Sequence, residues 1–593
     1  MSPPSSQKSL AFLRSIIVIR LINAFWVTTF FQPDEFFQSL EPAWDLAFGA
    51  NSGAWLTWEW HHQLRSSIHP AIFSVAYIVA DYASSILPVS TAVRDSIIVG
   101  APRALQAVIA ALGDWYTWQL ASDIYPDSNV SSFALFLQLF SAWQWYCSIR
   151  TFSNSLETTL TIAALYYFPW RELLGVASTT KDNPKPAGSI MRDPWSLRVS
   201  LALAALAVIL RPTNLLIWAT IGGLALTRIG LHGPSPLTQP SVWVLFREAV
   251  LCGSLVLAIS LASDRLYFGF WTFPPYNWLT FNISKSLAVF YGRNPWHYYL
   301  LQGLPLLSTT SLPFVLMGLW RPAAVTPEQA NVLHTLSLAV CVTTAALSLI
   351  SHKEVRFIYP LLPILNVLAA PLTASFFTSI PPSSDASSPS PPRIRNKPYL
   401  YLALSVNVLL AGYLSFFHQP APLSVLSYLR NQYTALNPIP NSNNDDLFAL
   451  FLTPCHSTPW RSHLIHPHLN AYALTCEPPL HTKPNTPERD NYRDEADRFY
   501  DDPVSFLADE LFNPNATGLP LPRYIVGFEG VQPWLEDFFG RTGRERGMDG
   551  VALTPVWMAF NGLFNEDWRR AGKMVVWETG HRDQADDVRA ATS

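Results

Sequence analysis

The sequence predicts a mainly α-helical protein that crosses a membrane many times and carries a small α/β or α+β domain at its C-terminal end. Of its 593 residues, 49% are hydrophobic and only 14% are charged, and the mean hydropathy is +0.17. Long apolar runs recur up to residue 417, whereas residues 419–593 lack them and are richer in Pro, Asp, Glu and His. Apolar runs of this length are typical of transmembrane helices. The net charge of −3 does not indicate a nucleic-acid partner.

The first apolar run, residues 11–31, predicts a retained transmembrane helix, because no small-residue cleavage site follows it. Lys8, Arg14 and Arg20 lie before or within this run and favour a cytosolic N-terminus. We expect about eleven to thirteen spans in total, because further runs of sufficient length recur along the chain. These runs are residues 68–88, 95–118, 133–150, 155–175, 199–227, 247–263, 301–320, 332–350, 357–378 and 399–417.

One of these runs could form two short helices rather than one span. Arg211 and Pro212 interrupt residues 199–227, and a proline removes a backbone donor and bends or ends an apolar helix. The two halves would then return to the side of the membrane on which they began.

Loop charges predict the orientation. The loops 177–198 and 380–398 both carry Lys and Arg, and the second is also rich in Pro and Ser, so we expect both in the cytosol. The alternation of spans then places residues 352–357 on the lumenal side. Whether an even or an odd number of spans lies between residues 95 and 170 stays open. The expected division is a membrane domain, 1–418, with lumenal loops at 32–67 and 264–302, and a lumenal C-terminal domain, 419–593.

The polar C-terminal region contains two cysteines, Cys455 and Cys476. In an oxidising lumen they could form a disulfide, and the alternative is two free thiols. A zinc site would combine them with nearby histidines, but paired Cys-x-x-Cys spacing is lacking, so we expect no metal there. Asn515 heads an Asn-x-Thr sequon far from any span, which makes it the best candidate for glycosylation among three sequons that also include Asn129 and Asn282.

Two adjacent carboxylates, Asp34 and Glu35, follow the first apolar run and suggest chemistry on a lipid-linked substrate at the membrane boundary. An acidic first turn of an interfacial helix after Pro33 is an equally good interpretation. Glu59 and Arg65 add polar groups to the same loop and could instead pair with each other. Trp58 and the other aromatic residues of this loop also suit a membrane interface.

A basic cluster of His352, Lys353 and Arg356 is expected at the same membrane surface. An arginine fork beside a lysine suits a phosphate, and the positive-inside rule makes such a cluster unexpected on the lumenal side unless it has a function. The loop 264–302 supplies aromatic groups, among them Tyr291, Trp296 and His297, which could stack on sugar rings or form an aromatic belt.

An ordered set of motifs between residues 30 and 360 resembles the dolichyl-phosphate-mannose-dependent mannosyltransferases of the endoplasmic reticulum, glycosyltransferase family 22 of the GT-C superfamily. The C-terminal region resembles the branch of that family that acts on the glycosylphosphatidylinositol (GPI) anchor. The motifs are Phe31-Gln-Pro-Asp-Glu-Phe-Phe37, Leu56-Thr-Trp-Glu-Trp60, Arg150-Thr-Phe-Ser-Asn-Ser-Leu-Glu157, Leu210-Arg-Pro-Thr213, Phe290-Tyr-Gly-Arg-Asn-Pro-Trp-His297, His352-Lys-Glu-Val-Arg-Phe-Ile-Tyr-Pro360 and, in the C-terminal region, Leu452-Thr-Pro-Cys-His456.

This resemblance implies a GT-C fold and the transfer of a third, α-1,2-linked mannose from dolichyl-phosphate-mannose to a dimannosyl GPI precursor. A β-linked donor and an α-linked product imply an inverting single displacement, in which one carboxylate acts as general base. We expect Asp34, as the more buried of the pair, to be this base. Glu35 would orient the acceptor or serve as the base in place of Asp34.

The remaining roles follow from the resemblance. Arg356, Lys353 and His352 are expected to stabilise the departing phosphate, so that no obligatory metal is expected. Whether a metal is required stays open. The expected substrate-binding residues are Trp58, Glu59, Arg65, Arg150, Asn154, Glu157, Tyr291, Trp296 and His297. For Arg150, Asn154 and Glu157 the alternative is hydrogen bonding between helices.

Three alternatives remain at this stage. The first is a mannosyltransferase of the same superfamily that acts on the dolichol-linked N-glycan precursor. The second is a non-catalytic lipid or sugar transporter, which would favour pseudo-symmetric halves that we do not find in the sequence. The third is a structural subunit, which would not need acidic and basic clusters on one face.

Overall fold

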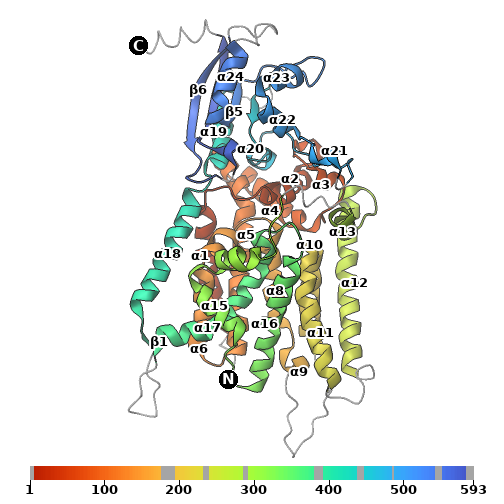
Figure 1. The fold of residues 1–593 in the computed structure, drawn as a ribbon, viewed down its shortest axis with the longest axis vertical. Coiled ribbons are helices and arrows are strands. Elements are labelled where there is room, and N and C mark those ends of the chain that lie inside the picture. The colour runs from red at the N-terminus through yellow and green to blue at the C-terminus, as the bar shows by residue number, and fades with distance from the viewer. Residues whose placement is uncertain are drawn as a thin grey trace, which may run out of the picture.

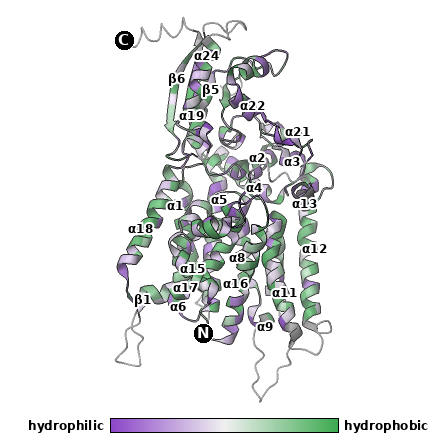
Figure 2. Cartoon of the chain, in the orientation of Figure 1, coloured by the Kyte–Doolittle hydropathy of each residue, from purple (hydrophilic) through white to green (hydrophobic). Residues whose placement is uncertain are grey.

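The computed structural model describes residues 6–174, 194–231, 240–284, 292–379, 392–436, 447–483, 486–540, 551–565 and 567–581. A bundle of helices forms one end of the elongated molecule, and a sheet domain from the C-terminal part of the chain forms the other (Figure 1). Hydrophobic residues run along the outer helices α12 (Pro240–Phe268) and α18 (Lys397–Phe416), whereas the sheet domain has more hydrophilic residues (Figure 2). The mainly α-helical membrane protein with a small C-terminal sheet domain is therefore confirmed.

Within the described residues, seven segments are long and apolar enough to cross a membrane: Ser9–Trp26, Thr91–Ile124, Val242–Phe268, Tyr299–Trp320, Pro327–Ser348, Val355–Phe377 and Lys397–Leu436. This number is lower than the eleven to thirteen expected, because several of the expected runs form shorter helices. These include α6 (Ser128–Leu139), α7 (Ala142–Cys147), α8 (Ser153–Tyr167), α9 (Trp170–Leu174), α10 (Trp195–Leu210) and α11 (Leu215–Leu231). Helix α8 and the segment Val355–Phe377, which contains α17 (Leu362–Phe377), form the buried centre of the bundle.

The expected span at 68–88 does not cross the bundle. It forms α4 (Ile68–Ile86), whose first turn is joined to the end of α12 by the bond from the Ser67 backbone N–H to Asp264 (2.7 Å). The next helix, α5 (Thr91–Ile124), begins beside the C-terminal domain, where Asp95 pairs with His466 (3.4 Å). Both ends of α4 therefore lie at the same end of the molecule. One face of α4 is buried and the other exposes large apolar side chains, as in helices that lie in a membrane interface.

The interrupted run at 199–227 forms a helical hairpin. Helix α10 ends at Leu210, a short 3₁₀ turn covers Pro212–Asn214, and α11 returns beside α16 (Pro327–Ser348) to the end from which α10 started (Figure 1). The extended backbone of Arg211 makes the break. The alternative of two short helices is thus confirmed.

The two ends of the molecule carry different parts of the chain. The N-terminus, α9 and the small strands β1 (Thr378–Ser379) and β2 (Arg393–Ile394) lie at the end opposite to the sheet domain (Figure 1). Most of the loops 177–198 and 380–398 lies outside the described residues. The first loop (residues 32–67) lies at the other end of the molecule, next to the C-terminal domain. It contains α2 (Glu41–Phe48) and α3 (Trp58–His61).

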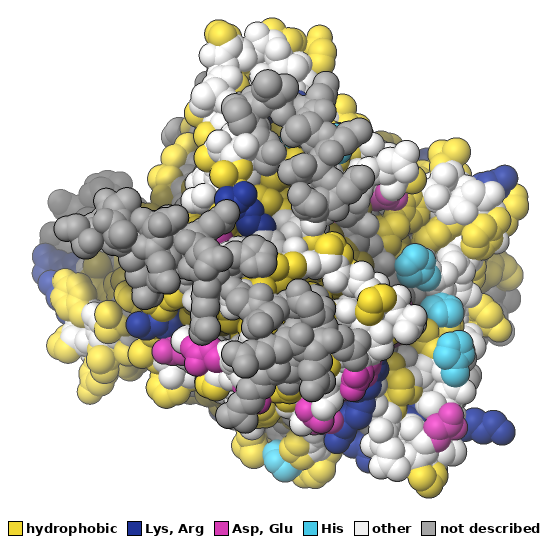
Figure 3. All heavy atoms as spheres, turned by 90° about the horizontal axis from the view of Figure 1, so that it is seen from above, with side chains coloured by type: hydrophobic (Ala, Val, Ile, Leu, Met, Phe, Trp, Pro, Cys, Tyr) yellow, Lys and Arg dark blue, Asp and Glu magenta, His cyan; other side chains and the backbone are white. Residues whose placement is uncertain are grey.

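Four further helices complete this part of the molecule. They are α1 (Ser6–Trp26), α13 (Pro274–Ser284), α14 (Leu304–Ser308) and α15 (Leu312–Trp320). Viewed from the end that carries the C-terminal domain, acidic and basic side chains are mixed over the visible surface (Figure 3).

The C-terminal domain is a five-stranded mixed sheet in the order β4-β3-β5-β7-β6. Strand β3 (Ala449–Leu452) is parallel to both β4 (Ala471–Ala473) and β5 (Tyr524–Phe528), whereas β7 (Lys573–His581) is antiparallel to β5 and to β6 (Val551–Phe560). The domain's helices are α19 (Ala421–Leu436), α20 (Arg461–Leu464), α21 (Pro487–Asp490), α22 (Glu495–Asp501), α23 (Pro503–Phe506) and α24 (Gln532–Gly540). Side chains alternate between the two sheet faces, and both faces are buried.

One of these faces shares a hydrophobic core with the first loop. Phe36, Phe37, Leu40 and Trp44 pack in the same buried cluster as α19 and strands β3, β5 and β7. Glu41, fully buried between the two parts, accepts hydrogen bonds from the backbone N–H groups of Trp55 (3.0 Å) and Ser462 (2.9 Å). The C-terminal domain is therefore joined to the first loop by a continuous core and not by a linker alone.

We expect Glu41→Ala to destabilise this junction by about 1–3 kcal/mol, because two backbone donors lose their acceptor in a buried place. Burial raises the pKa of Glu41, so Glu41→Gln, which is neutral and of similar size, should cost less than the alanine variant. Thermal unfolding of the purified protein in detergent would measure both. Glu578→Ala is the matched control, because Glu578 pairs with Arg523 on the exposed sheet surface and should contribute about 0–1 kcal/mol. Equal losses at both positions would contradict this role of Glu41.

Candidate active site

The acid pair begins a helical turn that directs its two carboxylates to different places. The backbone N–H groups of Phe36 and Phe37 both donate to the Pro33 carbonyl (2.9 Å each), and a π-helical turn follows at Phe36–Leu40. Successive residues of a helix point about 100° apart. Glu35 therefore points into the protein, while Asp34 lies at the edge of the buried region.

Glu35 forms a buried ion pair with Arg150. The distance from Arg150 Nη1 to Glu35 Oε2 is 2.8 Å, and both side chains are at most 1% exposed. Arg150 also donates to the carbonyls of Thr29 (3.0 Å) and Tyr146 (3.1 Å), and its guanidinium lies 4.2 Å from the centre of the Tyr146 ring. These bonds hold the loop after α1 against α7, so Glu35 has a structural role in this arrangement.

Asp34 is the more exposed carboxylate of the pair, with 20% of its side chain accessible. The expectation that Asp34 would be the more buried of the two is wrong, because Arg150 draws Glu35 inward. Asp34 Oδ2 is 2.6 Å from Arg356 Nη1. Since Asp34 is accessible and held in place, it is the carboxylate of this pair that a substrate can reach.

Arg356 is positioned by Glu354, a residue to which the sequence analysis gave no role. Glu354 accepts from Arg356 Nε (2.6 Å) and Nη2 (2.8 Å) and also lies 3.1 Å from His352 Nε2. Burial raises the pKa of Glu354, but the charges of Arg356 and His352 outweigh it and hold that pKa far below its usual value. The hydrogen bond that His352 donates to Glu354 in turn raises the pKa of His352. The result is a line of alternating charges, His352–Glu354–Arg356–Asp34.

Lys353, the third member of the expected basic cluster, is buried and has another partner. Its Nζ donates to the Asn294 carbonyl (2.9 Å), and the Asn294 amide donates back to the Lys353 carbonyl (2.8 Å). Lys353 therefore anchors the loop that follows α13 beside the site.

A third arginine, Arg211, joins this group from the break between α10 and α11. Its guanidinium lies 5.1 Å from the centre of the Phe357 ring, and the charges of Arg65, Glu157, Arg356 and Asp34 all act on it. Among the described residues no side-chain or backbone acceptor receives a hydrogen bond from this guanidinium. The sequence analysis treated Arg211 only as a helix break, although a charged residue inside an apolar run is itself a signal of function.

Arg65 pairs with Glu59 across the first loop (3.0 Å), as the sequence analysis considered. Arg65 also lines a small cavity of about 20 Å³ beneath this loop, together with Gln38, Ser66, His69, Ser153 and Leu210. That volume suits about one water molecule. Arg65 Nε and His69 Nε2 are buried there and have no hydrogen-bond partner among the described residues, so the polar lining of the cavity could bind a water molecule.

The expected group of Arg150, Asn154 and Glu157 is divided between two places. Arg150 pairs with Glu35, whereas Glu157 accepts from Asn154 (3.3 Å) and from Asn214 of the break after α10 (2.9 Å). All of these side chains are buried between helices. In this structure Arg150, Asn154 and Glu157 therefore make hydrogen bonds inside the helical bundle, which is the alternative that the sequence analysis gave for them.

The expected aromatic residues do not gather around Asp34. Trp296 is 68% exposed, and its ring packs edge to face on His297. Trp58 packs near His62 and Phe281 at the surface of the first loop. Tyr291 lies outside the described residues.

The C-terminal domain contributes a histidine to the neighbourhood of the acid pair. His456 has its ring centre 4.1 Å from that of Phe37, and its backbone is in the left-handed region with φ of 53°. Burial lowers the pKa of His456 to about 4, while the charge of Asp34 acts in the opposite direction. The neighbouring Cys455 forms a disulfide with Cys476, so neither cysteine offers a thiolate to a metal ion.

Comparisons with known proteins show the family to which this chain belongs. The sequence profile of the Alg9-like mannosyltransferase family matches residues 11–465. GPI mannosyltransferase 3 of Gibberella zeae is 67% identical over 592 residues, covering 97% of this chain and 95% of that protein. GPI alpha-1,2-mannosyltransferase 3 of Mus musculus is 33% identical over 532 residues, covering 89% and 83%.

Among solved structures, ArnT from Cupriavidus metallidurans in the apo state has a similar fold. The TM-score is 0.52 at 12% sequence identity, and the match covers 98% of this chain and 99% of that one. At this identity the likeness concerns the fold alone.

Proposed function

Because the chain belongs to the Alg9-like mannosyltransferase family and is a mannosyltransferase, we propose that it adds the third mannose to the GPI anchor. The donor in this proposal is dolichyl-phosphate-mannose, the acceptor is a dimannosyl GPI precursor, and the new linkage is α-1,2. The names of the fungal and mouse relatives support the acceptor, and the mouse name also supports the linkage. The single structural observation that carries the chemistry is the accessible Asp34 held by Arg356.

In the proposed reaction, Asp34 accepts the proton from the 2-hydroxyl of the acceptor's terminal mannose as that oxygen attacks C1 of the donor mannose. The bond from C1 to the phosphate oxygen breaks on the opposite side, and dolichyl phosphate leaves with the electron pair. Inversion at C1 converts the β-linked donor into an α-linked product. Asp34 then carries the proton, which it releases to water.

Positive charge for the departing phosphate comes from arginines around Asp34. Arg211 lies close enough to Arg65, Arg356 and Asp34 for their charges to act on it, and its guanidinium has N–H groups available for an anion. Arg356 is held by Glu354 and Asp34, so its role is to orient Asp34 and add to the local positive potential. The expected phosphate site of His352, Lys353 and Arg356 is thereby revised to one centred on Arg211.

We expect Arg211→Met to lower kcat/KM for dolichyl-phosphate-mannose by about 10²–10³-fold, because a charged donor to the leaving phosphate is lost. Arg211→Lys should recover part of this loss, since it restores the charge without the planar fork. Arg94→Met is the matched control, because Arg94 pairs with Asp81 on an exposed surface. Unchanged donor kinetics in the Arg211→Met enzyme would contradict a role of Arg211 in binding the phosphate.

The proposal also places the active site and the C-terminal domain in the lumen of the endoplasmic reticulum. Asn515 is exposed on the C-terminal domain, while the sequon at Asn129 lies at the opposite end, where its side chain donates to Thr378 (2.9 Å). We therefore expect Asn515→Gln to remove an endoglycosidase H-sensitive shift in gel mobility and Asn129→Gln to leave it unchanged. The reverse pattern would show that the protein has the opposite orientation in the membrane.

The acceptor can be tested in membranes that contain this protein, supplied with labelled dolichyl-phosphate-mannose. We expect label in the dimannosyl GPI precursor, in a product sensitive to an α-1,2-specific mannosidase, and none in the dolichol-linked N-glycan precursor. Label in the N-glycan precursor alone would show that this precursor, and not the dimannosyl GPI precursor, is the acceptor. No labelled product from folded protein would contradict the proposed reaction.

A further inference from the structure

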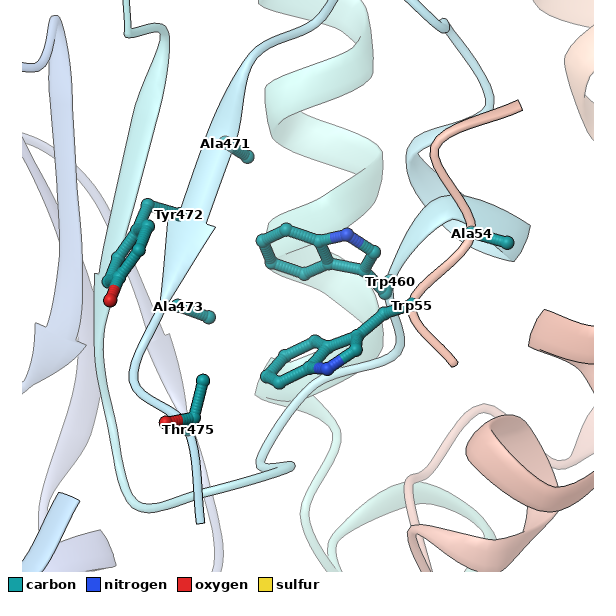
Figure 4. Close-up of a pocket in the computed structure, with 7 residues that line it drawn as sticks. All are labelled: Ala54, Trp55, Trp460, Ala471, Tyr472, Ala473 and Thr475. Carbon is teal, nitrogen blue, oxygen red and sulfur yellow. The ribbon is translucent and has the colours of Figure 1, made fainter. Parts of the chain in front are cut away.

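A shallow pocket opens where the first loop meets the edge of the C-terminal sheet (Figure 4). It has a volume of about 230 Å³. Trp55 of the first loop and Trp460, which precedes α20, form one wall, and Ala471, Ala473 and Thr475 in and after β4 form the other. None of these residues belongs to the charged groups around Asp34.

The two indoles give this pocket the chemistry of a sugar-binding surface. Their ring centres are 5.2 Å apart and their planes meet at 72°, so they form an aromatic corner. An aromatic face packs against the C–H face of a sugar ring, and an indole N–H can donate to a sugar hydroxyl. Within the described residues, neither Trp55 nor Trp460 donates its indole N–H to another protein group, and Trp55 is the more exposed of the two.

Strand β4 leaves space in front of this corner. Ala471 and Ala473 lie on one face of the strand and point toward the indoles, while Tyr472 points to the other face, where its hydroxyl donates to Glu495 (2.7 Å) (Figure 4). β4 is an edge strand of the sheet, so part of its backbone is open to hydrogen bonding with a ligand. The two small side chains therefore determine how much room the pocket has.

The pocket is connected to the acid pair through Phe37. The ring centre of Trp55 is 5.3 Å from that of Phe37 and 5.1 Å from that of His456. Phe37 lies one helical turn after Asp34, and the Cys455–Cys476 disulfide fixes the segment that carries His456. Phe37 is 2% exposed, so these contacts pack the Trp55 wall of the pocket against the turn that carries Asp34.

We propose that the Trp55–Trp460 pocket binds one inner sugar ring of the acceptor glycan, a ring that does not carry the attacking hydroxyl. Pockets for drug-sized ligands are roughly 300–1,000 Å³, and the smaller volume here suits a single ring. The identity of the acceptor rests on the proposed function. The pocket makes the C-terminal domain part of acceptor recognition and gives the enzyme a contact that distinguishes acceptors by their inner sugars.

The test fills the pocket without touching the charged site. Ala473→Leu and, independently, Ala471→Leu would occupy the space in front of the indoles. Ala552→Leu on β6, at the opposite edge of the same sheet, is the matched control. Thermal unfolding in detergent would show that each variant is folded. Transfer is then compared with two acceptors, the complete dimannosyl GPI precursor and a synthetic dimannoside that lacks the inner sugars.

We expect both pocket variants to raise the KM for the complete precursor about tenfold while kcat changes by less than about twofold, because an inner ring contributes to binding but not to the chemical step. The kinetics with the dimannoside should stay as in the wild type, and Ala552→Leu should behave as the wild type with both acceptors. Equal effects of the pocket variants on both acceptors, or no effect on either, would overturn the proposed subsite.

Direct binding separates this inference from the proposed function. Fluorescence anisotropy with a labelled dimannosyl GPI precursor, without donor, should show about tenfold weaker binding to the two pocket variants than to the wild type. Weaker binding to these variants together with no transfer by the wild type would support the subsite and reject the proposed reaction. Equal binding by wild type and pocket variants, or no binding by the wild type, would overturn the subsite.

Discussion

Asp34→Asn is expected to lower mannosyl transfer by about 10²–10⁴-fold, the range typical for loss of a positioned general base. The asparagine keeps the shape of the side chain and one oxygen that can still accept from Arg356, but it cannot take a proton from the acceptor hydroxyl. Arg356 remains held by Glu354 through two hydrogen bonds, so the site should keep its geometry. The loss should therefore appear in kcat, with little change in the thermal unfolding temperature.

The measurement is the initial rate of transfer in membranes with matched amounts of folded protein. Asp45→Asn is the control, because Asp45 lies in α2 of the same first loop and away from the Arg356 ion pair. A variant Asp34→Asn that retains wild-type activity would show that another group is the base. Glu354 would then be the next candidate, because it is the other carboxylate in contact with Arg356.

Arg150→Met is expected to destabilise the folded protein by about 3–5 kcal/mol, because it leaves the Glu35 carboxylate buried without its charged partner. The methionine fills much of the space but satisfies neither Glu35 nor the carbonyls of Thr29 and Tyr146. We expect less folded protein in the membrane and a lower unfolding temperature in detergent. Activity per folded molecule should fall much less than in Asp34→Asn.

The double variant Arg150→Met with Glu35→Gln should recover part of this stability, because it removes both charges instead of one. Arg498→Met is the control for the loss of an arginine: Arg498 pairs with Glu510 on the surface, and such pairs contribute about 0–1 kcal/mol. If Arg150→Met were as stable as this control, the buried pair would not be the structural element inferred here. If Glu35→Gln alone abolished transfer in folded protein, Glu35 would have a direct part in the reaction.

The sequence predicted the membrane bundle and offered the helical hairpin at Arg211 and Pro212 as one of two possibilities. It also predicted that Asp34 and Arg356 belong to one site, although 322 positions separate them. It did not predict that α4 would lie along one end of the bundle. A run of nineteen residues is long enough to span, and only the packing of its buried face against the first loop shows its direction.

The two carboxylates show the limit of prediction most clearly. In the sequence, Asp34 and Glu35 are adjacent and equivalent, and neither composition nor spacing assigns them different partners. The fold brings Arg150 to Glu35 across 115 positions, Arg356 to Asp34, and Trp460 to Trp55, and so divides the acid pair and builds the pocket.

Hydropathy is a local property that adds up along the chain, so the sequence by itself determined the class of protein and identified the charged residues that could take part in chemistry. Ion pairs, burial and pockets depend on which distant segments meet. The tertiary structure alone therefore decided that Glu35 is buried in an ion pair with Arg150, that Asp34 is accessible, that Arg211 lies beside Phe357 and that the C-terminal domain shares a core with the first loop.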